Sequence, residues 1–221
     1  MKGRVLIVAG SDSGGGAGIQ ADIKTVTALG GYAMTAITAL TAQNTTGVHG
    51  IHDVPADFVA LQMRLVLTDI GADCVKTGML HRADVIEAVA TTLRECAPNV
   101  PVIVDPVMVA KGGHPLLAPE ATVAMRHGIV PLAALVTPNV PEAEALTGLT
   151  IRDDNDAAHA ARMIATLGPK AVLMTGGHLT GETVTDYLLY DDKIFEVFQS
   201  PRIETQHTHG TGCTLASAIA L

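Results

Sequence analysis

The sequence lacks a cysteine framework, a basic patch and a long apolar run. Its three cysteines, Cys74, Cys96 and Cys213, form no Cys-x-x-Cys pair, which argues against a disulfide scaffold and suits a reducing compartment. Lys and Arg total 14 against 22 Asp and Glu, so the net charge of -8 makes nucleic acid a poor partner. The apolar run 5–9 is too short for a signal peptide, and no run approaches the roughly 20 residues of a membrane span. We therefore expect a cytoplasmic protein.

The composition is typical of a folded α/β protein, with 48% hydrophobic and 16% charged residues. Runs rich in β-branched residues alternate with segments of helical periodicity, which predicts one α/β domain over residues 1–221 with a mainly parallel sheet and helices on both faces. The expected strands are 4–9, 32–40, 73–76, 101–104, 134–136, 171–174 and a hairpin, 183–190 with 193–199, that turns at Asp191 and Asp192. The expected helices are 19–29, 55–68, 82–96, 119–127, 141–146, 154–167 and one that begins after Cys213. Polar and glycine clusters follow the strands, at the sheet edge where ligands bind in such folds.

The first of these clusters is the glycine-rich loop 10–18. It lacks the Lys-Ser/Thr pair of a P-loop and the spacing of a dinucleotide-binding fingerprint. Glycine permits close approach of the backbone to a small ligand. A flexible strand-to-helix connection is an equally good interpretation of the loop alone.

The last cluster runs from His207 to Cys213 and leads into an Ala/Leu-rich helix start. Gly210 and Gly212 would expose backbone N–H groups at the positive end of that helix, which predicts an anion site. The same dipole is expected to lower the pKa of the Cys213 thiol. A glycine-rich connection with a buried cysteine, a zinc site made by His207, His209 and Cys213, and a Cys/His nucleophile pair are alternatives.

Two further polar groups follow apolar strands. Asp105 comes directly after the strand 101–104 and is suited to hold Mg²⁺, although a turn Asp before a proline is the simpler interpretation. Asn139 precedes a helix with proline at its first position, so Glu142 falls in the first turn. Glu142 either complements the helix dipole or orients a metal-bound water.

Taken together, several segments resemble hydroxymethylpyrimidine/phosphomethylpyrimidine kinase, the thiamin-pathway branch of the ribokinase-like superfamily. The segments that carry the resemblance span the chain and are 10–25, 38–45, 76–80, 104–108, 137–143, 175–178 and 208–214. The resemblance implies a three-layer α/β/α fold. It also implies ATP- and Mg²⁺-dependent phosphorylation of 4-amino-5-hydroxymethyl-2-methylpyrimidine and then of its monophosphate, by positioning and charge neutralisation.

The resemblance also implies roles for individual residues. Gln43 and Asp22 would hydrogen-bond the aminopyrimidine, in a pocket lined by Gly10, Met79 and Val107. Asp105 and Glu142 would serve Mg²⁺, and Asn139, Thr175, Gly177 and Thr211 would serve the nucleotide and its phosphates. Gly210 and Gly212 would form the anion hole, and Cys213 stands where most of the superfamily carry an aspartate base.

The chain departs from the family pattern in two places. Thr175 stands where many relatives carry lysine, so we expect a phosphate contact either to be missing or to be supplied by Lys111. The sequence ends at Leu221, where relatives continue for several elements that help wall the nucleotide site; we expect either a fragment or a less complete nucleotide site.

Two rival functions are compatible with the same pattern. A pyridoxal kinase of the same fold would not need an acceptor such as the Gln43 carbonyl oxygen for a pyrimidine amine. A non-catalytic pyrimidine-binding or scaffold protein would bind the pyrimidine without turning over ATP. Ribokinase-like relatives further suggest a homodimer.

Overall fold

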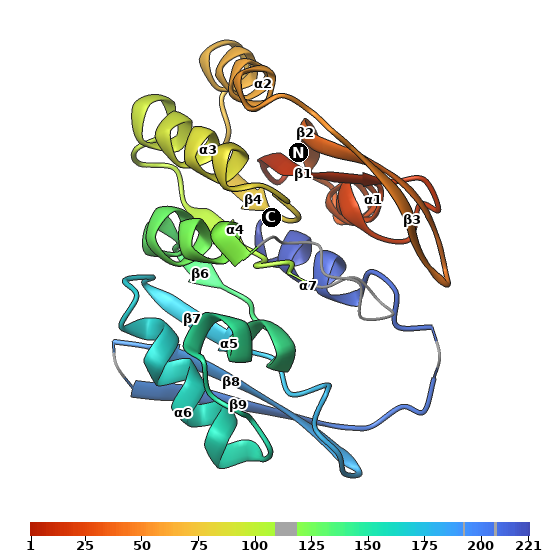
Figure 1. Ribbon diagram of the computed structural model, residues 1–221, viewed down its shortest axis with the longest axis vertical. Helices are drawn as coiled ribbons and strands as arrows, with labels where there is room; N and C mark the ends of the chain where they lie inside the picture. Colours follow the sequence, from red (N-terminus) through yellow and green to blue (C-terminus); the bar gives the residue numbers. More distant parts are fainter. Residues whose placement is uncertain (109–118, 192, 206) are drawn as a thin grey trace.

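The computed structural model describes residues 1–108, 119–191, 193–205 and 207–221 (Figure 1). A nine-stranded sheet runs through it in the order β3-β2-β1-β4-β5-β6-β7-β8-β9. The strands are β1 Arg4–Asp12, β2 Tyr32–Asn44, β3 Gly47–Asp53, β4 Cys74–Thr77, β5 Val102–Val104, β6 Leu135–Val136, β7 Ala171–Met174, β8 Thr183–Tyr190 and β9 Lys193–Pro201. The six strands from β2 to β7 in this order pair in parallel, whereas β3, β8 and β9 run antiparallel to their neighbours.

Helices cover both faces of the sheet. They are α1 Gly18–Ala28, α2 Ala56–Asp69, α3 Ala83–Cys96, α4 Pro119–Ala124, α5 Val140–Thr147, α6 Asp154–Ala165 and α7 Thr211–Ile219, with a π-helical turn at Met125–Ile129 and a 3-10 turn at Val130–Leu132 between α4 and β6. None of the helices in the described ranges is long and apolar enough to cross a membrane.

The alternation of side chains along β1 shows how the layers are held together. Ile7 and its alternate neighbours pack in a cluster with α1 and α7, which lie side by side (Figure 1). Leu6 and Val8 point the other way, into the larger core cluster beneath α2 to α6. Both faces of a parallel strand are therefore buried, which is why β1 reads as a continuous apolar run. The expected three-layer α/β/α arrangement is confirmed.

The main departure from the expected elements lies at the second strand. The expected strand 32–40 is too short: residues 41–44 continue β2, and β3 pairs back on it as a hairpin. This hairpin reaches past the sheet edge beside α1 (Figure 1). Much of the hairpin is exposed, so its sequence is largely polar and lacks the apolar pattern by which a strand is recognised. Asp192, part of the other expected turn, lies outside the described residues.

The strand order reverses at β1, since the chain passes from β1 to β2 on one side and then returns to β4 on the other. Such a reversal leaves a crevice at the carboxyl ends of the two central strands. The polar segments that follow β1, β4 and β5 meet there.

Candidate active site

A pocket of about 460 Å³ opens at the carboxyl ends of β1, β4 and β5, a volume within the range of small-molecule sites. Segments from the whole chain contribute to it: the loop after β1, the end of β2, the residues after β4 and β5, the start of α5, and the turn before α7. The expected site residues that line it are Gly10, Gln43, Met79, Asp105, Val107, Asn139, Glu142, Gly210, Thr211, Gly212 and Cys213.

Lys76 is a buried cation at the base of this pocket. Its Nζ lies 2.9 Å from Asp22 Oδ1 and 3.5 Å from Asp105 Oδ2, and the Lys76 and Asp22 side chains are fully buried. Ser217 of α7 donates to the same Asp22 oxygen at 2.7 Å. Burial alone would lower the pKa of Lys76, but Cys213, Asp105 and Asp22 together raise it, so the side chain is an ammonium. Asp22 therefore lies under the pocket, tied to Lys76, and does not line it.

Asp105 and Glu142 form the acidic side of the pocket. Asn139 and Glu142 make a reciprocal capping box: Asn139 Oδ1 accepts the Glu142 N–H, and Glu142 Oε2 accepts the Asn139 N–H, both at 3.0 Å. Burial, with the nearby Asp105 charge, raises the pKa of Glu142 to about 8. Burial likewise raises the pKa of Asp105, against the influence of Lys76. The ionised forms of both carboxyl groups are therefore disfavoured, and a cation bound between them would stabilise the two negative charges.

The donors present fit Mg²⁺. Asp105 Oδ2 is buried without a hydrogen-bond partner among the described residues, since the 3.5 Å to Lys76 is too long for a good hydrogen bond. In the same residues no cluster of three or more His, Cys, Asp or Glu side chains could hold a metal. Mg²⁺ is usually bound by one or two carboxylates together with water and substrate phosphates. Asp105 and Glu142 supply the two carboxylates of that donor set and leave the other coordination positions to water and phosphate.

The turn before α7 closes the pocket opposite the first glycine loop. Gly210 has φ +81°, and a Cβ on it would lie 1.8 Å from the carbonyl oxygen of Gly16, so the two loops are packed backbone against backbone. The helix begins at Thr211, whose N–H lies 3.4 Å from the Thr208 carbonyl oxygen, and the N–H groups of Gly212 and Cys213 have no backbone acceptor among the described residues. Together with the helix dipole, these N–H groups could bind an anion at the expected position.

The expectation of an acidic Cys213 thiol is wrong. Burial, together with the Asp105 and Asp22 charges, raises the pKa of Cys213 to about 12, although Lys76 acts in the opposite direction. Burial, aided by the two neighbouring carboxylates, thus keeps the thiol protonated. The thiol hydrogen-bonds to Asp105 instead.

An apolar wall faces these polar groups. Met79 packs with Ala39, Val48 and Val107 in a small cluster at the pocket. A Cβ on Gly10 would lie 3.3 Å from Met79 Sδ, so a side chain there would push into the pocket. A flat ring could lie against this wall with a polar group directed at Asp105.

The remaining expectations fall outside the pocket lining. Thr175 pairs with Asn139 through a backbone bridge, and its N–H donates to the Pro138 carbonyl at 3.0 Å. Gly177 is exposed, and its carbonyl accepts from Arg202 Nη1 at 3.0 Å. Lys111 lies outside the described residues.

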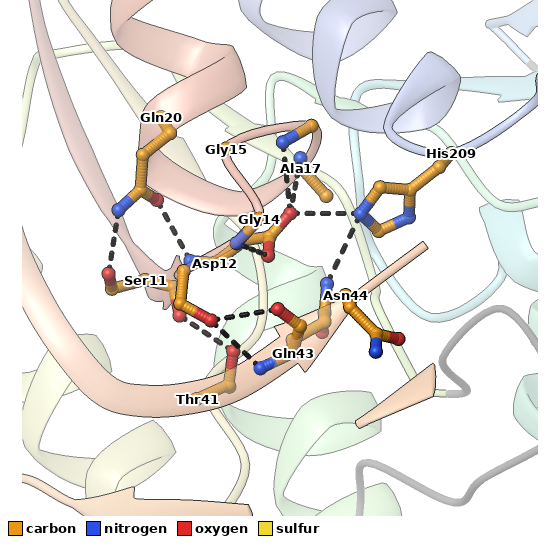
Figure 2. A network of polar contacts seen from close by, with 12 residues as sticks. Ser11, Asp12, Gly14, Gly15, Ala17, Gln20, Thr41, Gln43, Asn44 and His209 are labelled. Carbon is orange, nitrogen blue, oxygen red and sulfur yellow. Dashed lines mark hydrogen bonds and ion pairs between the residues drawn. The ribbon is translucent and has the colours of Figure 1, made fainter. Parts of the chain in front are cut away.

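The zinc and Cys/His alternatives find no support, because the three side chains lie in different surroundings. His207 is exposed. His209 Nε2 contacts Asp12 Oδ2 at 2.8 Å (Figure 2). Cys213 contacts Asp105 instead.

Sequence reasoning gave no role to Asp12, Lys76 or the imidazole of His209 as a partner of Asp12. Lys76 was detectable in principle, because a lysine inside a short buried strand needs a counter-charge. Asp12 follows the run 4–11 at the edge of the glycine loop, where a carboxylate can accept several N–H groups. Its partner His209 is 197 residues away, and no local pattern joins the two.

Comparison with known proteins relates the whole chain to one family. The family model described as phosphomethylpyrimidine kinase matches residues 12–221. A thiamine biosynthesis bifunctional protein of Geobacter sulfurreducens is 56% identical over 99% of the chain, which spans 44% of that protein. A hydroxymethylpyrimidine/phosphomethylpyrimidine kinase of Bacillus subtilis is 49% identical over 98% of the chain, which spans 79% of it.

Solved structures agree with this relationship. A phosphomethylpyrimidine kinase from Clostridium difficile superposes with a TM-score of 0.85 at 43% identity, covering 98% of this chain and 88% of its own. The ADP complex of Bacillus subtilis pyridoxal kinase superposes with a TM-score of 0.90 at 40% identity, covering 98% of this chain and 82% of its own.

Proposed function

Because the chain belongs to the phosphomethylpyrimidine kinase family, we propose that it is an ATP-dependent kinase of thiamine biosynthesis. It would phosphorylate 4-amino-5-hydroxymethyl-2-methylpyrimidine and then the resulting monophosphate. The observation that carries the proposal is a single pocket that combines an apolar ring-sized wall, two buried carboxyl groups and an anion-binding turn. Phosphoryl transfer needs these three provisions more than it needs covalent chemistry.

Each part of the pocket has a proposed task. Met79 and Val107, with Gly10 packed beside Met79, would hold the pyrimidine ring. Gln43 would make a polar contact with it. The N–H groups at Gly212 and Cys213 would stabilise negative charge that builds on the transferred phosphoryl group. A hydroxymethyl group on the ring would then lie between the wall and the turn.

ATP and a metal ion would meet the substrate at the acidic side of the pocket. Asp105 and Glu142 would hold Mg²⁺, which when bound neutralises phosphate charge. The Asn139 capping box keeps the Glu142 carboxylate oriented for this task. Asn139 and Thr211 remain our candidates for contacts with the nucleotide phosphates. Thr175 and Gly177 would act by shaping the backbone beside Asn139.

Cys213 remains our proposed acceptor for the proton of the substrate hydroxyl, because it lines the pocket at the anion-binding turn. A thiolate of raised pKa is a strong base present in a small fraction. A carboxylate at the same position is a weaker base with a larger ionised fraction. These two effects partly offset each other in general base catalysis, so aspartate is a reasonable replacement.

The proposal is tested by measuring ADP release with the hydroxymethylpyrimidine, its monophosphate and pyridoxal, each with ATP and Mg²⁺. We expect turnover with the first two. Asp105→Asn should reduce it strongly, whereas the exposed Asp73→Asn, remote from the pocket, should not. Pyrimidine binding without any ADP release would support the scaffold alternative and refute the kinase proposal.

Pyridoxal is a second candidate substrate, and one observation favours it. The solved structures most like this chain in fold include a Bacillus subtilis pyridoxal kinase with ADP bound. An apolar wall with a hydroxymethyl-accepting turn would also suit a substituted pyridine. The ratio of kcat/KM for the two rings, measured in the same assay, decides between a dedicated and a dual enzyme.

Assembly and location stay predictions. We propose a homodimer by analogy with ribokinase-like relatives, and light scattering after gel filtration would test it. The expected cytoplasmic location would be tested by fractionating cells that express a tagged chain.

A further inference from the structure

Three side chains from distant segments meet at the rim of the pocket: Asp12 at the end of β1, Gln43 in β2 and His209 before α7 (Figure 2). His209 Nε2 lies 2.8 Å from Asp12 Oδ2 and 3.3 Å from Gln43 Nε2. One imidazole nitrogen therefore faces a carboxylate and an amide at once. The carboxylate requires a nitrogen that donates a hydrogen bond, whereas the NH2 group requires one that accepts, and a ring nitrogen cannot do both.

The surroundings of Asp12 decide which demand is met. Its carboxylate accepts the N–H of Gly14 at 2.7 Å, of Gly16 at 3.0 Å and of Ala17 at 2.8 Å. Burial alone would raise the pKa of Asp12, but the hydrogen bonds from His209 and from these backbone groups outweigh it and lower the pKa. Asp12 is thus an anion that only accepts, so His209 Nε2 must carry a proton directed at it. This holds for neutral imidazole and for imidazolium alike.

A protonated Nε2 cannot accept a hydrogen bond from the Gln43 NH2 group. Two donors would face each other across 3.3 Å. Turning the Gln43 amide by half a rotation brings Oε1 to that position and converts the contact into the weaker branch of a three-centre hydrogen bond. The NH2 group is then the end of the amide left for the pocket.

The backbone of Gln43 is held firmly enough for this orientation to matter. Ser13 Oγ accepts the Gln43 N–H at 2.9 Å and donates to the Gln43 carbonyl at 2.8 Å. A Cβ on Gly16 would lie 2.6 Å from the His209 ring, so this glycine makes the room in which the imidazole sits. The Gln43 backbone and the His209 ring are therefore both held in position.

We propose that Asp12 and His209 are positioning residues that turn the Gln43 carbonyl oxygen to the imidazole and present the Gln43 NH2 group to the substrate. The pocket then recognises an acceptor heteroatom, such as the ring nitrogen beside the amino-bearing carbon, and not the exocyclic amine. This reverses the part that the sequence suggested for Gln43. The identity of the substrate rests on the proposed function, whereas the orientation of the amide does not.

The orientation is tested first without substrate. Enzyme labelled with nitrogen-15 in histidine gives the protonation of each ring nitrogen of His209 in a long-range proton–nitrogen spectrum, and His209→Phe identifies the signal. We expect a proton on Nε2. A bare Nε2 with the proton on Nδ1 would overturn the proposal.

The consequence for recognition is tested with Gln43→Glu, read by calorimetric Kd values and by KM. Glutamate keeps an acceptor toward His209 but replaces the pocket-facing donor by an acceptor. We expect the parent pyrimidine to bind about ten-fold or more weakly, as for Gln43→Ala, because its ring nitrogen loses a donor. The exposed Gln199→Ala serves as the matched control and should bind normally. Retained or tighter binding in Gln43→Glu refutes the proposal, because it means that a carbonyl oxygen meets the amine.

Two substrate analogues locate the contact. With a pyrimidine that lacks the exocyclic amine, Gln43→Ala should cost as much binding as with the parent compound. With the pyridine in which that ring nitrogen is replaced by C–H, Gln43→Ala should cause no further loss of binding. The opposite pattern refutes the proposal. If the wild-type enzyme binds none of these rings, the proposed function fails, and the histidine spectrum still decides the orientation of the amide.

Discussion

Replacing Lys76 by methionine should leave two carboxylates, Asp22 and Asp105, buried side by side without a counter-charge. Lys76 Nζ lies 2.9 Å from the first and 3.5 Å from the second, and methionine fills nearly the same volume. The hydrogen bond from Ser217 then remains as partial compensation on Asp22. Removing one partner of a buried ion pair typically costs about 3–5 kcal/mol. We expect a loss of that size in the free energy of unfolding.

The assay is urea unfolding near neutral pH with a chelator present, so that no bound metal replaces the missing cation. The slope with urea should be unchanged, which shows that the denatured state is the same. Lys170→Met, at an exposed position, is the matched control and should change stability by no more than about 0.5 kcal/mol. The double variant Lys76→Met with Asp22→Asn should recover part of the loss, because one uncompensated charge is gone. A Lys76→Met loss below about 1 kcal/mol, or strictly additive effects in the double variant, would refute the reasoning.

Four further outcomes follow from the same site. Asp105→Asn should raise the Mg²⁺ concentration needed for half-maximal turnover more than it weakens pyrimidine binding, and an unchanged Mg²⁺ titration removes Asp105 from the metal site. Cys213→Ala should keep pyrimidine and ATP binding but lower kcat at least about 100-fold, with part of the rate returning in Cys213→Asp; a near-normal rate in folded Cys213→Ala discards the base role. Gly210→Ala should prevent the two glycine loops from closing, because its Cβ would lie 1.8 Å from the Gly16 carbonyl oxygen, and the expected result is lost turnover with a lower melting temperature; normal values for both would contradict the packing described. Asp12→Asn should reduce stability near neutral pH but not in strong acid: the folded pKa of Asp12 is lowered, so its contribution is present above the unfolded value of about 3.9 and is lost as pH falls through the folded value. Urea titrations of both proteins across this range test the sign, and a constant gap between them contradicts it.

The sequence was most informative where a local pattern sets the structure. The apolar run of β1 and the proline at the start of α5 predicted a buried strand and a helix with Glu142 in its first turn, and both are present. The hairpin of β2 and β3 was missed, because its exposed polar residues carry no strand signal of their own. Its stability comes from cross-strand pairing, which no local pattern encodes.

The candidate site divides in the same way. Asp105 and Glu142 were predictable because each follows a strand or opens a helix. The pKa of Cys213 was not, because the helix dipole is a local effect, whereas burial and the Asp22 and Asp105 charges arise from the assembled fold.

The contact between the loop after β1 and the turn before α7 has a consequence for how the chain acquires activity. Asp12 and His209 are 197 residues apart, so the rim of the pocket cannot exist until nearly all of the chain between them has folded. Closing so long a loop carries an entropic penalty that substrate binding at the rim would help to offset. During synthesis, a ribosome-bound chain that has not yet released α7 would have most of its sheet but no closed pocket. Ligand binding would therefore report docking of α7, and a substrate-dependent gain in protease resistance should appear only once α7 is docked against α1.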